Sequence, residues 1–244
     1  LDRGDILEPS SLVPRGTPEF FASPLAKIEG SGRLQLANWL TKTNSLQSAL
    51  VARTSVNRVW QNLFGEALCR TPKELGRLGA TPEMPELIDG LAAHLIESDW
   101  SLKSLIRTIV TSDAYTRTSM TTDANHTADR FNRYFARQNV RRLQAESILN
   151  TFVTLSDGAR PGIHKQPNRK DSRAIDILAN FDGPSTDDII DRRTQSISAT
   201  QALFLMNARN AYNNVANELS QRHRANKQSD LFSVLDPLFL EILG

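Results

Sequence analysis

Four polar residues in the second half of the 244-residue chain form the main candidate site. Asp182 stands in a Phe-Asp-Gly-Pro turn, where its carboxylate can cap backbone amides or project into a cleft. Arg193 precedes a helix predicted to begin near Ser198, and an inward guanidinium there needs an acceptor. We therefore expect Arg193 to pair with Asp182, close to Ser196 and Gln201, which can cap the helix or bind a ligand.

Arg142 and Glu146 form a second candidate pair. They are four residues apart, which places them on one face of a helix and favours a modest ion pair. Glu146 would become a candidate general acid only if burial strongly raised its pKa. An enzyme is the alternative to the binding function that is given at the end of this subsection. It would be a hydrolase or a redox-assisted enzyme acting on complex polysaccharide. In that function Asp182 and Glu146 serve as acid and base, and Arg193 stabilises negative charge.

A third set of candidates, Asn57, Arg58 and Trp60, lies on one predicted helix. Trp60 belongs to the apolar stripe of this helix, while the other two lie off its centre. These three residues predict core packing through the apolar stripe, together with a helix-capping or interhelical polar contact. The alternative is a ligand site in which Trp60 forms a stacking floor and Arg58 clamps an anion.

The sequence lacks the usual motifs for metals and cofactors. Its one cysteine, Cys69, excludes Cys-x-x-Cys metal and haem motifs, and no phosphate-binding loop, dinucleotide-binding turn or hydrolase elbow occurs. The four histidines show no ligand spacing: His94, His126, His164 and His223. We therefore predict no metal site and no cofactor.

The charge balance argues against a strongly electrostatic partner. Lys and Arg total 29 against 27 Asp and Glu, so the net charge is only +2. One basic cluster lies near Phe131, Tyr134 and Phe135, and we interpret it as a solvated amphipathic helix: Arg130, Arg133, Arg137, Arg141 and Arg142. No apolar run approaches the roughly 20 residues that span a bilayer. We predict neither a nucleic-acid partner nor a membrane span.

Helical periodicity dominates the rest of the chain. Residues 1–31 contain closely spaced prolines that predict an extended arm. Apolar residues then recur at i, i+3, i+4 and i+7 over 56–64, 88–96 and 102–110. The last two segments are separated by a short connection that predicts a helical hairpin.

The remaining punctuation predicts further elements. A short helix follows Thr71, residues 116–127 form a surface loop, and another helix ends near Asp157. Residues 159–195 have little periodicity and predict a long irregular loop. A helix then begins near Ser198, and we expect its buried side to carry Ala199, Ala202, Leu203 and Met206. The final apolar helix covers 231–243. We predict a mainly α, irregular multi-helix domain over 32–244 after a Pro-rich arm over 1–31.

Several ordered segments resemble the DUF1553 family. They include Leu-Ala-Asn-Trp-Leu at 36–40, Val-Asn-Arg-Val-Trp-Gln-Asn-Leu-Phe-Gly at 56–65, Trp-Ser-Leu-Lys at 100–103, Arg-Arg-Leu-Gln-Ala-Glu at 141–146 and Phe-Asp-Gly-Pro at 181–184. Arg-Gly-Asp at 3–5, Arg-Arg at 192–193, Ser196 and Gln-Ala-Leu at 201–203 extend the resemblance. The chain departs from the family at 159–180, which is basic and polar rather than rich in glycine and aromatic residues.

The resemblance implies a cellular context rather than a mechanism. Members of this family occur mainly in planctomycetes, usually as the C-terminal part of large exported proteins with a DUF1549-like domain. Some add a cytochrome-c-like or carbohydrate-binding-like domain. We therefore expect a piece of a larger exported or periplasmic bacterial protein. Its function would be to bind a neighbouring DUF1549-like or cytochrome-c-like domain, or an extracellular polymer such as a polysaccharide.

Overall fold

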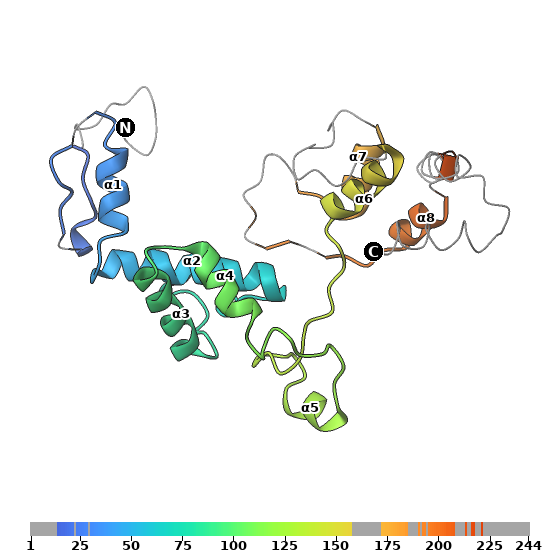
Figure 1. Ribbon diagram of the computed structural model, residues 1–244, viewed down its shortest axis with the longest axis horizontal. Coiled ribbons are helices and arrows are strands. Elements are labelled where there is room, and N and C mark those ends of the chain that lie inside the picture. The colour runs from blue at the N-terminus through green and yellow to red at the C-terminus, as the bar shows by residue number, and fades with distance from the viewer. Residues whose placement is uncertain are drawn as a thin grey trace. The chain divides into compact units, whose positions relative to one another are not determined.

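The computed structural model describes two compact units, Leu1–Val140 and Arg141–Gly244, which are treated separately below (Figure 1). About half of the described residues are helical and none of them forms a strand, which confirms the mainly α prediction. No helix among them is long and apolar enough to cross a membrane. The residues described are 14–21, 23–28, 30–157, 172–184, 190, 192–193, 195–207, 213, 216–217 and 221.

The described part of the arm is fastened to the first helix by one tryptophan. Residues 14–31, as far as they are described, contain a 3-10 turn, η1 (Glu19–Phe21), and α1 follows at Arg33–Leu40. The indole Nε1 of Trp39 donates a hydrogen bond to the carbonyl of Ser23 at 2.7 Å. Its ring meets Phe21 edge-on at 5.2 Å. The described part of the arm is therefore held against α1 by specific contacts.

The longest helix, α2 (Leu46–Phe64), has strong signals at both ends. The hydroxyl of Ser45 accepts a hydrogen bond from the amide of Ser48 at 3.3 Å, which caps the first turn. Gly65 ends the helix at φ 82°, a left-handed conformation that glycine adopts without steric cost. The apolar stripe predicted over 56–64 thus lies on one continuous helix.

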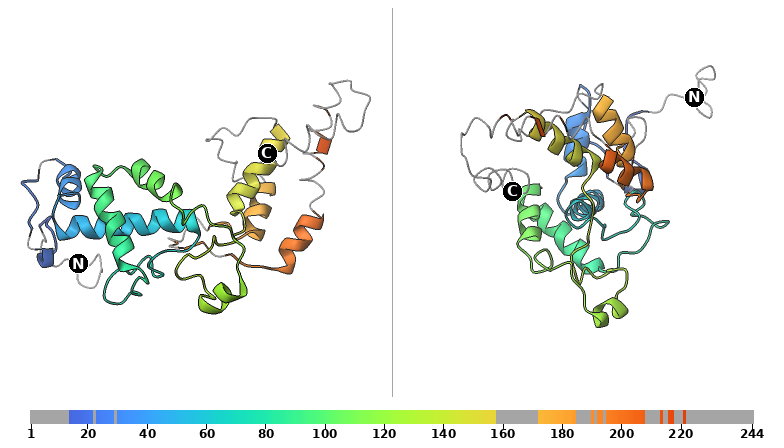
Figure 2. Two further views of the ribbon diagram at one scale, coloured as in Figure 1. Left: turned by 60° about the horizontal axis from the view of Figure 1, so that its bottom comes forward. Right: turned by 90° about the vertical axis from the view of Figure 1, so that its right-hand side faces the viewer.

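Two further helices pack against α2 as the predicted hairpin. They are α3 (Pro85–Glu97) and α4 (Leu102–Val110), and Ser101 caps α4 by accepting from the amide of Ser104. Both green helices lie against α2 in the views of Figure 2. The short connection therefore returns the chain as the sequence predicted.

The core of this unit is built around stacked aromatic rings. Trp60 lies parallel to Phe64 with centroids 4.2 Å apart, and Phe135 meets both rings edge-on. The other buried hydrophobic residues of this cluster come from α2, the segment after it, α3 and α4: Ala52, Val56, Leu68, Ile88, Ala92, Leu95, Leu105 and Ile109. Burial of this surface is the main force that holds the three helices together.

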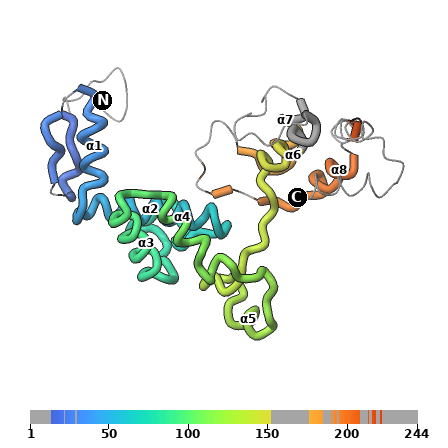
Figure 3. The backbone as a smooth tube through the Cα atoms, viewed as in Figure 1, coloured from blue at the N-terminus to red at the C-terminus, as the bar shows by residue number. Residues whose placement is uncertain are grey.

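Three local predictions for this unit are wrong. The segment after Thr71 forms turns rather than a helix, because the Thr71 hydroxyl donates to the Glu74 carbonyl and accepts from the Ala80 amide. The predicted loop at 116–127 contains most of a short helix, α5 (Asp123–Ala128), capped by Thr122. The basic segment 130–142 is irregular and not an amphipathic helix, as the tube that follows α5 in Figure 3 shows.

The second unit contains α6 (Ala145–Asp157), α7 (Ser172–Asn180) and α8 (Ala199–Asn207). Its core joins Ala145 and Leu149 of α6 to Ile177 and Phe181 at the end of α7, with Phe204 of α8 alongside. Helix α7 lies inside the segment predicted to be irregular. It is stabilised by packing that a local period does not reveal.

The orientation of α8 differs from the prediction. Gln201 is buried and Phe204 is half-buried, whereas Leu203 and Met206 are exposed, together with Ala199 and Ala202. The helix instead uses its opposite side, because Phe204 packs against Phe181 and Gln201 joins a polar cluster. The predicted helix at 231–243 lies outside the described residues.

Candidate functional site

Arg142 is the centre of the polar cluster that the second unit contains. Its Nη1 donates to the carbonyl of Ser196 at 2.6 Å and to Oε1 of Gln201 at 2.8 Å. Its Nη2 donates to the carbonyl of Phe181 at 3.2 Å and to Oδ2 of Asp182 at 2.7 Å. One guanidinium therefore joins the end of α7 to the segment that enters α8, and we call this set of five residues the arginine clasp.

Asp182 is held on both carboxylate oxygens. Oδ1 accepts from the Ser196 hydroxyl at 2.7 Å, and Oδ2 accepts from the Ser196 amide at 2.8 Å as well as from Arg142. Its backbone φ is 58°, in the left-handed region that aspartate tolerates better than most residues. This turn directs the carboxylate toward the residues that precede α8.

The clasp also sets the entry into α8. Gln201 accepts from Arg142 through Oε1 and donates through Nε2 to the Ser196 hydroxyl at 3.1 Å. The Ser198 hydroxyl accepts from the Gln201 amide at 3.3 Å and caps the first turn. Ser196 thus connects Asp182 to Gln201. Of the two residues predicted to cap this helix, Gln201 does so, because its Oε1 accepts from the Ser198 amide at 3.4 Å and completes a capping box with the Ser198 hydroxyl.

The predicted pairing of the charged residues is wrong. Arg193 pairs with Glu146 at 2.6 Å, and Asp182 pairs with Arg142. The reason is that α6 begins at Ala145, so Arg142 lies before the helix and does not share a helical face with Glu146. Packing of α6 against α7 then brings the Asp182 turn to Arg142, and Arg193 reaches the first turn of α6.

Two polar atoms of this region have no hydrogen-bond partner in the described structure. They are Nε of Arg142 and Oε2 of Glu146, and both atoms are buried although their side chains are partly exposed. The Arg142–Asp182 pair retains only about a quarter of its side-chain exposure, 26% and 21%. The clasp is therefore well shielded, but water still reaches its edge.

The residues on α2 do not join this cluster. Asn57 is buried and brackets the backbone of Cys69: its Nδ2 donates to the Cys69 carbonyl at 3.1 Å and its Oδ1 accepts from the Cys69 amide at 2.8 Å. Trp60 is buried in the aromatic core, whereas Arg58 is exposed. This arrangement fits packing and a polar contact, because the Trp60 ring faces Phe64 and Phe135.

Arg142 carries more of the site than sequence reasoning assigned to it. The available signal was its place just before a helix start, where a side chain is free to reach another element. No group of three or more His, Cys, Asp or Glu side chains within the described ranges could hold a metal ion. The contacts of Arg142 within the clasp are charge-assisted hydrogen bonds to protein groups.

The clasp should make the second unit sensitive to acid. Hydrogen bonds from the Ser196 hydroxyl and amide, followed by Arg142, lower the pKa of Asp182 below its ordinary value. A lowered folded-state pKa stabilises the fold above the unfolded pKa of about 3.9, and this contribution is lost as pH falls through the folded value. We expect the carboxyl 13C signal of Asp182 to titrate with a midpoint below pH 3.9. Ser196→Ala should raise the midpoint of this titration, because it removes the hydroxyl that donates to the carboxylate. A midpoint unchanged by Ser196→Ala would contradict this assignment.

Comparison with known proteins gives one match. The family model described as "Protein of unknown function (DUF1553)" matches residues 32–174. No curated protein and no solved structure was found to match the chain. The match includes Asn57, Trp60, Arg142 and Glu146, and it ends before Asp182 and the entry to α8. Because it covers more than half of the sequence, the chain belongs to the DUF1553 family of proteins of unknown function.

Proposed function

We propose that this chain is a helical binding module of a larger exported bacterial protein, and that α8 docks a neighbouring domain of that protein. The clasp serves this function by holding α8 in a set orientation. Exported or periplasmic localisation and a DUF1549-like or cytochrome-c-like neighbour are parts of the same proposal, and they rest on the context that the family resemblance implies.

One observation carries the choice of binding over catalysis: the two carboxylates best placed for acid–base chemistry are engaged in ion pairs. Asp182 accepts three hydrogen bonds and its pKa is lowered, which disfavours a role as general acid. Glu146 is paired with Arg193. These contacts stabilise the ionised forms of both carboxylates. No contact in the described site favours the polysaccharide-cleaving alternative.

The exposed side of α8 is the surface we assign to docking. Leu203 and Met206 retain 55% and 78% of their exposure, and Ile197 just before the helix is fully exposed. The spacing of Ala199, Ala202, Leu203 and Met206 is that of a helix face built for burial. Contiguous exposed apolar surface of this kind commonly marks a protein contact.

The test measures binding of the whole chain to the DUF1549-like domain of its parent protein by isothermal titration calorimetry. We expect a defined Kd, weakened at least tenfold, about 1.4 kcal/mol, by the double variant Leu203→Glu and Met206→Glu. A charge placed in an apolar interface loses its hydration without gaining a partner.

The matched control is Met120→Glu, which introduces the same charge at a residue of similar exposure, 81%, in the first unit. It should leave the Kd unchanged. Equal weakening by both variants, or no binding by the unaltered chain to this domain or to a cytochrome-c-like domain of the parent, would refute docking through α8.

A further inference from the structure

The irregular segment 129–139 of the first unit, which we call the aromatic loop, has a shape determined by its own side chains. Asn132 is 4% exposed, and its Nδ2 donates to the Arg137 carbonyl and to Oδ1 of Asn139, both at 2.8 Å. Its Oδ1 accepts from the Arg137 amide at 3.2 Å. A single buried amide therefore closes the loop across its base.

A carboxylate closes the other side of the loop. Asp129 accepts from the amides of Arg133 and Tyr134 at 2.8 and 2.9 Å. Burial by itself would raise the pKa of Asp129, but these amides and the charges of Arg137 and Arg133 outweigh burial and lower it. Arg137 donates to the carbonyls of Asp129 and Arg130. The side chain of Arg137 is thus used inside the loop.

The loop is also anchored to the aromatic core. Phe135 is 5% exposed and packs edge-on against Trp60 and Phe64, while Arg117 donates to its carbonyl at 3.0 Å. Asn139 donates to the carbonyl of Phe64 at 3.1 Å. Phe135 has a φ of 50°, which is uncommon for a bulky residue and persists only where the surroundings enforce it.

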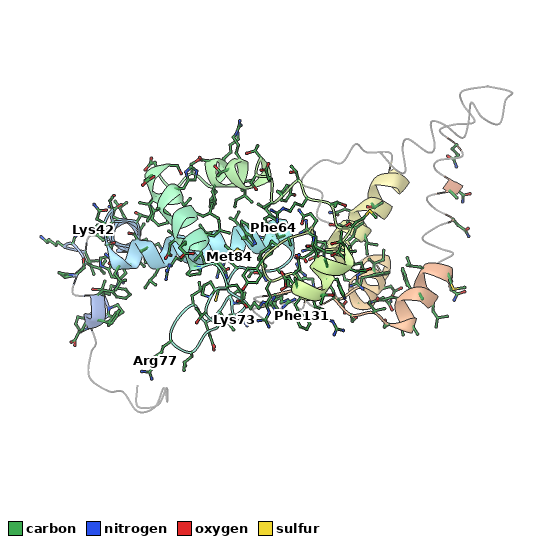
Figure 4. All side chains as sticks on the ribbon, turned by 90° about the horizontal axis from the view of Figure 1, so that it is seen from below. Lys42, Phe64, Lys73, Arg77, Met84 and Phe131 are labelled. Carbon is green, nitrogen blue, oxygen red and sulfur yellow. The ribbon has the colours of Figure 1, made fainter. Side chains whose placement is uncertain are left out.

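Two aromatic rings remain outside this framework. Phe131 and Tyr134 are 66% and 58% exposed, so the loop presents them to solvent instead of burying them (Phe131 is labelled in Figure 4, as is the buried Phe64). The guanidinium carbons of Arg130 and Arg133 lie 6.0 and 5.9 Å from the centroid of the Phe131 ring. Arg133 also donates to Glu83 at 3.0 Å.

We propose that the aromatic loop binds an acidic polysaccharide, a polymer whose sugar rings carry carboxylate or sulfate groups. The C–H faces of the sugars would pack on Phe131 and Tyr134, while Arg130 and Arg133 bind the anionic groups. Since the loop is held in place before binding, little conformational entropy is lost when the ligand is bound. This site lies in the first unit and does not depend on docking through α8.

The observations favour a sugar polymer over other anionic partners. Nucleic acid carries a phosphate at every residue and requires many basic contacts, but Arg137 is used within the loop, which leaves Arg130 and Arg133 as the basic residues beside the Phe131 ring. A stable protein interface buries about 800 Å² per partner around an apolar centre. The exposed Phe131 ring with two guanidiniums beside it, together with the exposed Tyr134 of the same loop, matches the alternating apolar faces and anionic groups of an acidic sugar chain more closely.

The experiment titrates the whole chain with three polysaccharides of matched length: a polyuronate, a sulfated glucan and a neutral glucan. We expect at least tenfold tighter binding of one or both acidic polymers than of the neutral one. Comparing the Kd for the polyuronate with the Kd for the sulfated glucan shows whether carboxylate or sulfate is preferred. Arg130→Gln should weaken acidic-polymer binding and reduce its dependence on salt.

Loss of the rings gives the decisive comparison. Phe131→Ala and Tyr134→Ala should each weaken binding at least tenfold with an unchanged thermal midpoint, because neither ring is in the core. Leu78→Ala removes an apolar side chain that is 85% exposed elsewhere in this unit, and it should leave the Kd unaltered. Binding that survives loss of both rings, binding to the neutral glucan alone, or tighter binding to single-stranded DNA or to an acidic peptide would overturn the proposal.

Discussion

Trp60→Ala is expected to lower the free energy of unfolding of the first unit by about 3 to 5 kcal/mol. Trp60 is 4% exposed, is stacked on Phe64 at 4.2 Å and meets Phe135 at 5.2 Å. Alanine would remove both ring contacts and leave a cavity between α2 and the segment that carries Phe135. The cost therefore combines lost transfer free energy with the energy of the cavity.

Urea denaturation followed by far-UV circular dichroism measures this loss. The control is Trp60→Phe, which retains a ring in the stack and removes the indole Nε1, a buried atom without a hydrogen-bond partner in the described structure. We expect this variant to cost less than about 1.5 kcal/mol. A Trp60→Ala protein with the unaltered urea midpoint would contradict the core assignment and favour the alternative of a ligand-stacking floor.

Arg142→Ala is expected to destabilise the second unit by about 3 kcal/mol. The change removes the donor for four acceptors at once, among them the carboxylate of Asp182 and the side chain of Gln201. The estimate lies at the lower end of the range for broken buried ion pairs because the pair keeps about a quarter of its exposure. Asp182 also retains its two hydrogen bonds from Ser196.

The matched control for Arg142 is Arg193→Ala. Its ion pair with Glu146 has one third of each side chain exposed, so its removal should cost less than about 1 kcal/mol. A double-mutant cycle of Arg142→Ala and Asp182→Ala, read from hydrogen exchange of α7 amides, should show strong non-additivity. Additive effects of these two changes would show that the clasp does not act as a unit.

The polar cluster was predictable in part. Asp182, Ser196 and Gln201 do lie together, because a turn before Pro184 and a helix entrance both place polar side chains near a reversal of the chain. Their functional role stays a prediction. The charge partners were not predictable, since Asp182 and Glu146 each had a basic residue at a plausible separation along the chain. Which arginine reaches which carboxylate depends on how α6 and α7 pack.

Local sequence signals predicted several elements of the first unit correctly, although the capping signal after Thr71 was misleading. The apolar stripe over 56–64 ends at Gly65 because a left-handed glycine satisfies a helix terminus within a few residues, whereas the start of α2 at the Ser45 cap was not predicted. The hairpin of α3 and α4 follows from two apolar stripes and a short connection. The single cysteine and the near-neutral charge likewise constrain the chemistry without reference to the fold.

Tertiary structure alone decided the features whose causes lie far apart in the sequence. The apolar stripe of α8 faces outward because residues on the other side of the helix are engaged. Arg142 binds Gln201, which lies 59 residues further along the chain, and Phe181 packs against Phe204. The aromatic loop is irregular because side-chain amides and carboxylates satisfy its backbone better than a helix could with Phe135 in the core. Periodicity reports which side of a helix is apolar, but packing energy determines which side is buried.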